Sequence, residues 1–315
     1  MKHTAIIGEC MIELNGTPFG EMHQTFGGDT LNTAVYLSRC AGDAVSVRYV
    51  TALGTDALSR GMKERWEKEG IVTDCVLTDA TRHAGLYLIQ LNEDGERTFL
   101  YWRNESAASR MLSLPDFNQV EKRLEQCYLI YLSGISLAIL PDADRTRLLD
   151  MLEQMAKKGI SIAFDGNYRP KLWQSKDETR HVYERILRFC SLALMTDEDE
   201  FALWDETATE EIFVRLQRFG IKTAVIKAGE NGCFCRDFEN GSPSVERIAA
   251  VPIKHPVDTT SAGDAFNAGF LAGYLQGKPV KTCALQGNML ASVVIMHKGA
   301  VVPRQATDSI ISAFK

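Results

Sequence analysis

Short apolar runs alternate along the chain with longer segments that carry charges on one side. The apolar runs predict buried strands at residues 5–7, 160–164 and 223–226. Periodic apolar positions predict helices over residues 58–68, 144–158, 176–189 and 210–219. Three of these helices are followed by glycine, a residue that commonly ends helices: Gly70, Gly159 and Gly220. The repeated strand–helix units predict an α/β fold with a mostly parallel sheet between helices.

One stretch departs from this alternation and predicts an antiparallel hairpin. Residues 84–91 and 97–103 have strand patterns, and Asp94-Gly95 between them is a strong turn signal. Alternation places on one face Arg97, Phe99, Tyr101 and Arg103, and on the other Thr98, Leu100 and Trp102. It likewise groups Tyr87, Ile89 and Leu91. We expect a lid or an assembly surface whose edge strands favour a homodimer, and a higher oligomer stays open.

The composition narrows the class of protein. The chain has 315 residues, 45% of them hydrophobic, and a formal net charge of −6. It can bury a large core, and its acidity argues against binding to nucleic acid or to a membrane surface. We expect no signal peptide, since the first apolar run is short, and no apolar stretch approaches the ~20 residues of a membrane helix. The eight cysteines are dispersed, which favours a cytoplasmic protein with reduced thiols.

Several common cofactor motifs do not occur in the sequence. There is no P-loop, no G-x-G-x-x-G and no H-E-x-x-H, and the six histidines show no metal-ligand spacing. A nicotinamide dehydrogenase would fit the strand–helix alternation, but the missing glycine motif disfavours it. We therefore look for chemistry in loops that follow strands, because ligands of parallel sheets bind there.

The most informative segment, residues 257–266, reads V-D-T-T-S-A-G-D-A-F and leads into a helix that begins near residues 262–264. Free N–H groups at the start of a helix bind anions, and the small Ala262 and Gly263 let a phosphate approach the backbone. Asp264 beside them can accept a hydroxyl proton, because an ordinary aspartate pKa of about 3.9 leaves it ionised at neutral pH. Phosphoryl transfer to an alcohol requires such an arrangement. A simple helix cap is the alternative.

A second segment, residues 26–34, reads F-G-G-D-T-L-N-T-A and precedes a predicted helix over residues 34–40. Its paired glycines permit a tight loop, and Asp29 and Asn32 offer polar groups suited to sugar hydroxyls. Taken alone, this segment is equally well explained as an ordinary helix cap.

The two segments together resemble signatures of the ribokinase-like (PfkB) sugar kinases. The first resembles D-T-T-G-A-G-D, with Ser261 in place of the first glycine, and the second resembles the sugar-holding G-G-x-x-x-N element. The resemblance implies a three-layer α/β/α sandwich, with residues 1–315 as one domain and a β lid formed mainly by about 10–26 and 83–104. It also implies that Asp264 is the catalytic base, that residues 262–264 form the anion hole, and that Asp258 binds the sugar or a cation.

The same resemblance implies ATP and Mg²⁺ as cofactors. The loop K-A-G-E-N-G at residues 227–232 resembles a family loop that borders ATP. The implied nucleotide contacts are Asn167, Lys227, Gly229, Gly232, Ser261, Ala262, Gly263 and Asn288. Thr196 and Asp199 occupy the place of a family N-x-x-E motif, and a phosphate or metal role and a solvated helix start stay equal alternatives. K⁺ dependence, through Asp258 and Thr260, also stays open.

Two arginines bear on the substrate. If Arg103 and Arg169 both face the site, they favour a carboxylate, because arginine binds carboxylates through two parallel hydrogen bonds. The alternative places Arg103 on the lid surface and Arg169 at the ATP phosphates. Four segments together resemble the family branch that phosphorylates the C6 hydroxyl of the sugar acid 2-keto-3-deoxygluconate: residues 27–32, 101–105, 132–138 and 167–170. The substrate contacts that this implies are Gly28, Asp29, Asn32, Tyr87, Tyr101, Arg103, Arg169 and Asp258.

Two rival functions remain at this point. The first is a kinase for a neutral sugar such as fructose or ribose, which would not need the arginine pair. The second is a catalytically silent sugar-binding protein on the same fold, which the presence of Asp264 disfavours.

Overall fold

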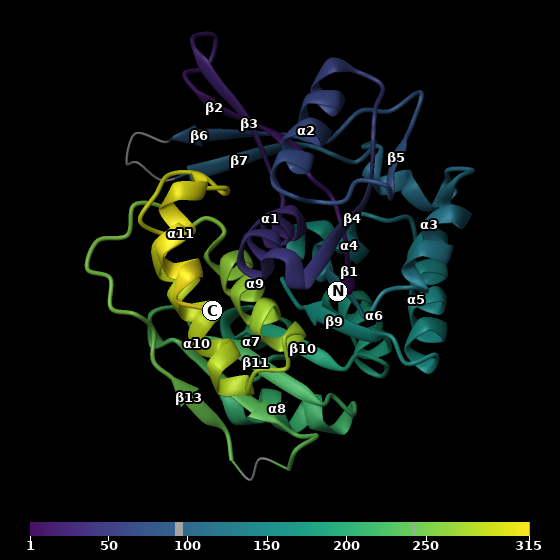
Figure 1. The fold of residues 1–315 in the computed structure, drawn as a ribbon. Coiled ribbons are helices and arrows are strands. Elements are labelled where there is room, and N and C mark those ends of the chain that lie inside the picture. Colours follow the sequence, from purple (N-terminus) through teal and green to yellow (C-terminus); the bar gives the residue numbers. More distant parts are fainter. Residues whose placement is uncertain (92–96, 242–243, 315) are drawn as a thin grey trace.

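A large twisted sheet organises the molecule (Figure 1). The computed structural model describes residues 1–91, 97–241 and 244–314. Within them, nine strands form the central sheet in the order β13-β12-β11-β10-β9-β8-β1-β4-β5. The sheet is parallel from β5 through β11 and ends in the antiparallel β12 and β13. These strands are β1 (Lys2–Ile7), β4 (Val45–Leu53), β5 (Val76–Thr78), β8 (Leu129–Ser133), β9 (Ser161–Asp165), β10 (Leu192–Thr196), β11 (Thr223–Lys227), β12 (Cys233–Asp237) and β13 (Glu246–Ile248).

Helices cover both faces of this sheet, as the strand–helix alternation predicts. One face packs against α3 (Phe117–Leu124), α4 (Gly134–Ala138), α5 (Asp142–Lys157), α6 (Lys176–Leu187), α7 (Asp197–Trp204) and α8 (Thr209–Arg218). The other packs against α1 (Asp29–Ala41), α2 (Ala57–Lys68), α9 (Ala262–Leu275), α10 (Val280–Val294) and α11 (Arg304–Ser312). The three-layer α/β/α sandwich is therefore confirmed.

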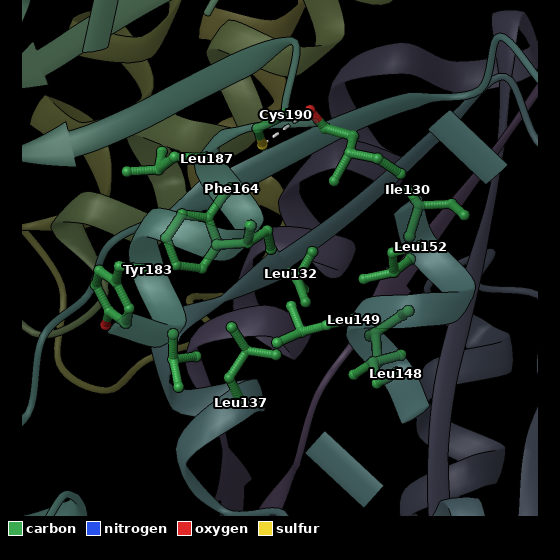
Figure 2. Close-up of a cluster of buried hydrophobic side chains, with 14 of the residues drawn as sticks. Ile130, Leu132, Leu137, Leu148, Leu149, Leu152, Phe164, Tyr183, Leu187 and Cys190 are labelled. Atoms are coloured by element: carbon green, nitrogen blue, oxygen red, sulfur yellow. Dashed lines mark hydrogen bonds between the residues drawn. The ribbon is translucent and has the colours of Figure 1, made fainter. Parts of the chain in front are cut away.

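Alternation along the central strands separates the two cores. In β1, Ala5 and Ile7 join one buried cluster, whereas Ile6 joins the other. Figure 2 shows the first cluster, where leucines of α5 lie against Ile130 and Leu132 of β8. Strands buried on both faces are nearly continuously apolar, which explains why the central strands appear in the sequence as short apolar runs.

A smaller sheet lies apart from the central one. Its strands, in the order β3-β2-β6-β7, are β2 (Met11–Gly16), β3 (Met22–Gly27), β6 (Leu86–Leu91) and β7 (Arg97–Trp102). The predicted antiparallel pairing is confirmed, with Leu86 opposite Trp102 and Leu91 opposite Arg97. The predicted turn at Asp94-Gly95 lies outside the described residues. β2 extends the hairpin by pairing in parallel with β6.

Helix ends follow the glycine signals, but one helix start differs from the prediction. Gly70, Gly159 and Gly220 have φ values of +82°, +92° and +85°, the left-handed region in which glycine ends helices. In contrast, α1 begins at Asp29, five residues before the predicted start at residue 34. An acidic residue in the first turn is favoured by the helix dipole, so Asp29 and Asn32 belong to the helix rather than to a preceding loop.

The cysteines behave as the sequence predicts. All eight are buried and unpaired within the described residues. Cys233 and Cys235 alternate along β12 and point into one core cluster, which explains their spacing. No helix among the described residues is long and apolar enough to span a bilayer.

Candidate active site

A cavity of about 730 Å³ opens where the central strands end and the small sheet faces them. Strands β9, β10 and β11 contribute their last residues, and α1 and α9 contribute their first turns. Of the predicted site residues, the cavity is lined by Gly28, Asp29, Asn32, Tyr87, Tyr101, Arg103, Asn167, Arg169, Lys227, Gly229, Gly232, Ser261, Ala262, Gly263, Asp264 and Asn288. Its position agrees with the rule that ligands bind at the carboxyl ends of parallel strands.

The start of α9, residues 261–264, forms a corner of this cavity that is suited to bind an anion. Ala262 donates its N–H group to the Thr259 carbonyl, so in the first turn the N–H groups of Gly263 and Asp264 are the ones available to a ligand. Ser261 precedes the helix with a φ of +65°, a left-handed conformation that is uncommon for serine. The Ser261 hydroxyl is buried and has no partner among the described residues. The corner therefore offers two N–H donors and one hydroxyl to phosphate oxygens.

Asp264 lies at this corner in an environment that the sequence does not reveal. The Asn32 amide donates a 2.8 Å hydrogen bond to its Oδ2 atom. Burial, followed by repulsion from Asp29 and Asp165, raises the pKa of Asp264 to about 7, and the Asn32 hydrogen bond and the Lys227 charge oppose this rise. The ordinary pKa assumed from the sequence is therefore wrong for this residue. A carboxylate that titrates near neutrality is well matched to a general base.

The first turn of α1 brings further polar groups to the cavity. The Asn167 amide donates a 2.7 Å hydrogen bond to Oδ2 of Asp29. Burial raises the pKa of Asp29 above its ordinary value, against the hydrogen bonds that it accepts. Gly28 has a steric reason to be glycine, because a Cβ atom there would lie 2.3 Å from the Glu9 carbonyl oxygen.

The small sheet contributes the inward face that the alternation predicts. Phe99, Tyr101 and Arg103 are among the residues that line the cavity, whereas Leu100 and Trp102 are not. The Arg97 side chain lies outside the described part of the chain. Arg103 is 8% exposed, which excludes the alternative of a lid-surface residue. Its Nε atom donates a 2.8 Å hydrogen bond to the buried Glu9, with which it also forms an ion pair.

Arg169 occupies a different setting at the edge of the cavity. Its side chain is 51% exposed, and its Nη1 atom contacts the Tyr168 carbonyl at 2.8 Å and Asp199 at 3.3 Å. Burial raises the pKa of Asp199, and the Arg169 charge opposes this rise. Thr196 and Asp199 both line the cavity. The segment for which a phosphate or metal role and a solvated helix start were equal alternatives therefore lies beside the site.

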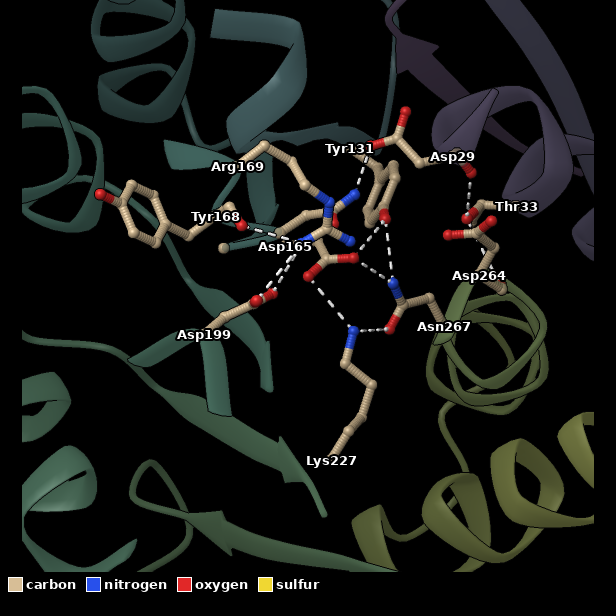
Figure 3. Close-up of polar contacts among 12 residues, drawn as sticks. Asp29, Thr33, Tyr131, Asp165, Tyr168, Arg169, Asp199, Lys227, Asp264 and Asn267 are labelled. Atoms are coloured by element: carbon tan, nitrogen blue, oxygen red, sulfur yellow. Dashed lines mark hydrogen bonds and ion pairs between the residues drawn. The ribbon is translucent and has the colours of Figure 1, made fainter. Parts of the chain in front are cut away.

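Four buried polar side chains beside the cavity form a network (Figure 3). Lys227 Nζ lies 3.2 Å from Asp165 Oδ1 and 3.2 Å from Asn267 Oδ1. The Asn267 amide nitrogen donates to Asp165 at 2.7 Å and to Tyr131 at 3.0 Å. Asp165, Asn267 and Glu9 are absent from the sequence-based set of site residues. The position of Asp165 at the end of a predicted strand could have indicated it, and Asn267 follows Asp264 by three residues on the same predicted helix. No local pattern in the sequence indicates Glu9.

Asp258 is the predicted site residue that does not line the cavity within the described structure. Its carboxylate accepts hydrogen bonds from the N–H groups of Thr260 and Gly299, both at 3.0 Å. It thereby joins the loop before α9 to the segment after α10. Asn288 does line the cavity, and its amide donates hydrogen bonds to the carbonyls of Ile248 and Ala249.

Comparison with known proteins agrees with this geometry. Residues 1–307 match the family described as pfkB family carbohydrate kinase. The chain is 51% identical over 315 residues to the 2-dehydro-3-deoxygluconokinase of Haemophilus influenzae, with 100% of each chain covered. It is 46% identical over 311 residues to the enzyme of the same name from Dickeya dadantii, covering 97% of this chain and 98% of that one.

Solved structures show the same fold. A putative ribokinase II from Escherichia coli, in complex with ATP and Mg²⁺, superposes with a TM-score of 0.81 at 17% identity and covers 99% of both chains. With a carboxylate at a helix N-terminus, a cavity at the strand ends and a family match over nearly its whole length, this chain belongs to the pfkB family of carbohydrate kinases.

Proposed function

We propose that this protein is an ATP-dependent kinase that phosphorylates the C6 hydroxyl of 2-keto-3-deoxygluconate, which is also called 2-dehydro-3-deoxygluconate. The observation that carries the chemistry is Asp264, with its pKa raised to about 7 beside the N–H donors of α9. The substrate rests on the names of the relatives at 51% and 46% identity and on the inward-facing Arg103. A neutral-sugar kinase is not favoured.

In the proposed reaction, Asp264 accepts the proton of the C6 hydroxyl as its oxygen forms a bond to the terminal phosphorus of ATP. The bond from that phosphorus to the bridging oxygen breaks, and ADP leaves. The N–H groups of Gly263 and Asp264 and the hydroxyl of Ser261 would receive the phosphoryl oxygens. Lys227, Gly229, Gly232, Asn167 and Asn288 line the cavity where the nucleotide would lie.

Mg²⁺ would neutralise phosphate charge in this reaction. In such sites it is held by phosphate oxygens together with one or two carboxylates. Glu198 and Asp199 line the cavity and supply carboxylates of the required type. Dependence on K⁺ through Asp258 and Thr260 stays a prediction. Both carboxylate oxygens of Asp258 already accept hydrogen bonds from backbone N–H groups.

We expect the substrate carboxylate to bind two arginines that already form ion pairs within the protein, Arg103 with Glu9 and Arg169 with Asp199. Arg103 is paired with Glu9, so its net charge is largely compensated, and it would act mainly through the N–H donors that Glu9 leaves free. Arg169 is half exposed and shares its charge with Asp199. Recognition of the acid would therefore depend on directional hydrogen bonds more than on net charge. Tyr87 and Tyr101 would shape the same side of the pocket.

We also propose that the small sheet closes over the sugar acid and forms a homodimer. Within the described residues, its outer strands β3 and β7 are edge strands, and edge strands can pair with a strand of another chain. On the outward face of β7, Leu100 and Trp102 are 39% and 58% exposed. A second copy of the chain packed here would cover the exposed apolar side chains and pair with an edge strand.

Replacing Asp264 with asparagine should abolish turnover while the sugar acid still binds, because the amide keeps the shape but cannot accept the proton. Calorimetric titration and an ADP-release assay measure the two effects. The pKa of Asp264 is higher in the folded protein than in the unfolded chain. Its protonated form therefore contributes to the free energy of unfolding below about pH 4, and this contribution is lost as the pH rises to about 7. The ligand-free Asp264→Asn protein should therefore melt at a higher temperature than the wild type at pH 8 but not at pH 4. Turnover near the wild-type rate would contradict the assignment.

The activity should follow the titration of Asp264. Because the base must be ionised, kcat/KM should fall about tenfold per pH unit below pH 7 and level off above it. Initial rates between pH 5.5 and 9 at subsaturating sugar acid test this. A profile that is flat from pH 5.5 to pH 8 would mean that the base has an ordinary carboxylate pKa.

Removing Arg169 should weaken binding of the acid specifically. A hydrogen bond to a charged group contributes ~1.5–3 kcal/mol, so Arg169→Ala should raise KM for the acid by roughly 10- to 100-fold. KM for the methyl ester of the same acid should change far less. Arg185→Ala, at a surface ion pair with Asp150, is the matched control. For Arg103, the double variant Arg103→Met/Glu9→Gln avoids an unpaired buried carboxylate and should show the same selectivity. Equal effects on acid and ester would remove the carboxylate argument.

The dimer proposal can be tested at Trp102. Sedimentation velocity should show a dimer for the wild type and a monomer for Trp102→Glu, because a charge would be buried in the interface. Tyr128→Glu, at a 46% exposed aromatic residue on the other side of the molecule, serves as control. A wild-type protein that stays monomeric at micromolar concentration would refute the proposal.

A further inference from the structure

The ammonium group of Lys227 lies at the cavity, where it contacts two other buried polar side chains. Lys227 is the last residue of β11 and is only 8% exposed, yet it lines the cavity. A lysine that served only to hold the following loop would not need its ammonium group there. Its Nζ atom instead reaches across the end of β10 to contact Asp165 at the end of β9 and Asn267 in α9 (Figure 3).

The direction of this ammonium group follows from its contacts. An ammonium has three N–H donors, and Asp165 and Asn267 accept two of them at 3.2 Å each. The third donor remains for a ligand. A Cβ atom built on Gly263 would lie 3.8 Å from Lys227 Nζ, with no other group outside its own turn of helix within 4 Å. The lysine therefore faces the anion-binding corner at the start of α9.

The partners of Lys227 hold it in one place. Asp165 is 2% exposed, and Asn267 and Tyr131 are fully buried. Asn267 accepts from the lysine and donates to both Asp165 and Tyr131, so it joins all three groups. Groups whose partners are themselves fixed need little reorganisation when charge develops in a reaction. A lysine on a flexible surface segment would not have this property.

We propose that Lys227 is a catalytic residue that donates a hydrogen bond to the transferring phosphoryl group, with Asp165 and Asn267 as positioning residues. Negative charge on the phosphoryl oxygens is stabilised as the C6 oxygen bonds to phosphorus and ADP departs. The ammonium keeps its proton throughout, because Asp264 takes the proton of the hydroxyl. This inference rests on the proposed kinase function and assigns Lys227 to the reacting phosphoryl group rather than to nucleotide binding in general.

The test compares Lys227→Met with Lys222→Met, a change of the same type at an exposed lysine directly before β11. Loss of one well-placed donor should lower kcat by about 100- to 1000-fold. KM for ATP should stay within about threefold, because ground-state binding does not depend on this contact. Lys222→Met should match the wild type. A rise in KM for ATP with unchanged kcat would overturn the proposal.

A double variant separates catalysis from structure. Lys227→Met alone leaves Asp165 as a buried, uncompensated charge, which can unfold the protein. Lys227→Met/Asp165→Asn removes both charges and should melt near the wild-type temperature. If Lys227 contacts the phosphoryl group, the double variant should still lose at least about 100-fold in kcat. Recovery of wild-type kcat would show that Lys227 only neutralises Asp165.

A binding measurement keeps this inference separate from the identity of the sugar acid. Calorimetry with MgADP alone and with MgADP plus aluminium fluoride, which mimics the transferring phosphoryl group, needs no turnover. Lys227→Met and the double variant should bind MgADP like the wild type and lose the additional affinity that fluoride confers. If the variants bound MgADP alone and MgADP with aluminium fluoride equally more weakly than the wild type, the proposal would be overturned. Wild-type protein that shows the fluoride effect but does not phosphorylate 2-keto-3-deoxygluconate would refute the proposed substrate alone.

Discussion

The site is dominated by three carboxylates that line one cavity. Asp29, Asp165 and Asp264 come from three segments that lie far apart in the sequence. The charge of Asp165 raises the pKa of both Asp29 and Asp264, and the charge of Asp29 also raises that of Asp264. Such a cluster is unfavourable in isolation because burial and like charges both oppose ionisation. It persists because asparagine amides donate to all three and because Lys227 is paired with Asp165. Burial, together with the remaining negative charge of Asp29 and Asp165, raises the pKa of Asp264 to about 7.

The architecture supports this cluster from two directions. Parallel strands end together, so β9 and β11 deliver Asp165 and Lys227 to one edge of the sheet. Helices α1 and α9 pack against each other and begin at the same edge, so their positive ends face the carboxylates and the anion corner. In Figure 1 these two helices lie side by side at the centre of the molecule. The fold thus concentrates donors where a transferring phosphoryl group would develop charge.

The small sheet is attached to this centre through a second buried charge pair. Glu9 follows β1, and its ion pair with Arg103 ties the end of β7 to the central sheet. Gly85 permits this approach, because a Cβ atom there would lie 2.9 Å from Oε1 of Glu9. An arginine that is already paired cannot attract a distant acid by net charge, but its planar donors stay oriented. Selection of an acid over a neutral sugar would then depend on geometry at the closed site.

The sequence by itself determined what depends on neighbours along the chain. Periodicity located the helices and the hairpin, glycines marked helix ends, and the residues at the start of α9 indicated an anion site beside a base. Only the tertiary structure decided that α1 starts at Asp29, that Asp258 lies outside the cavity and that Arg103 is paired with Glu9. The same holds for the raised pKa of Asp264 and for Lys227 beside Asp165. These features depend on desolvation and on distances between remote segments, and neither quantity is encoded in local residue patterns.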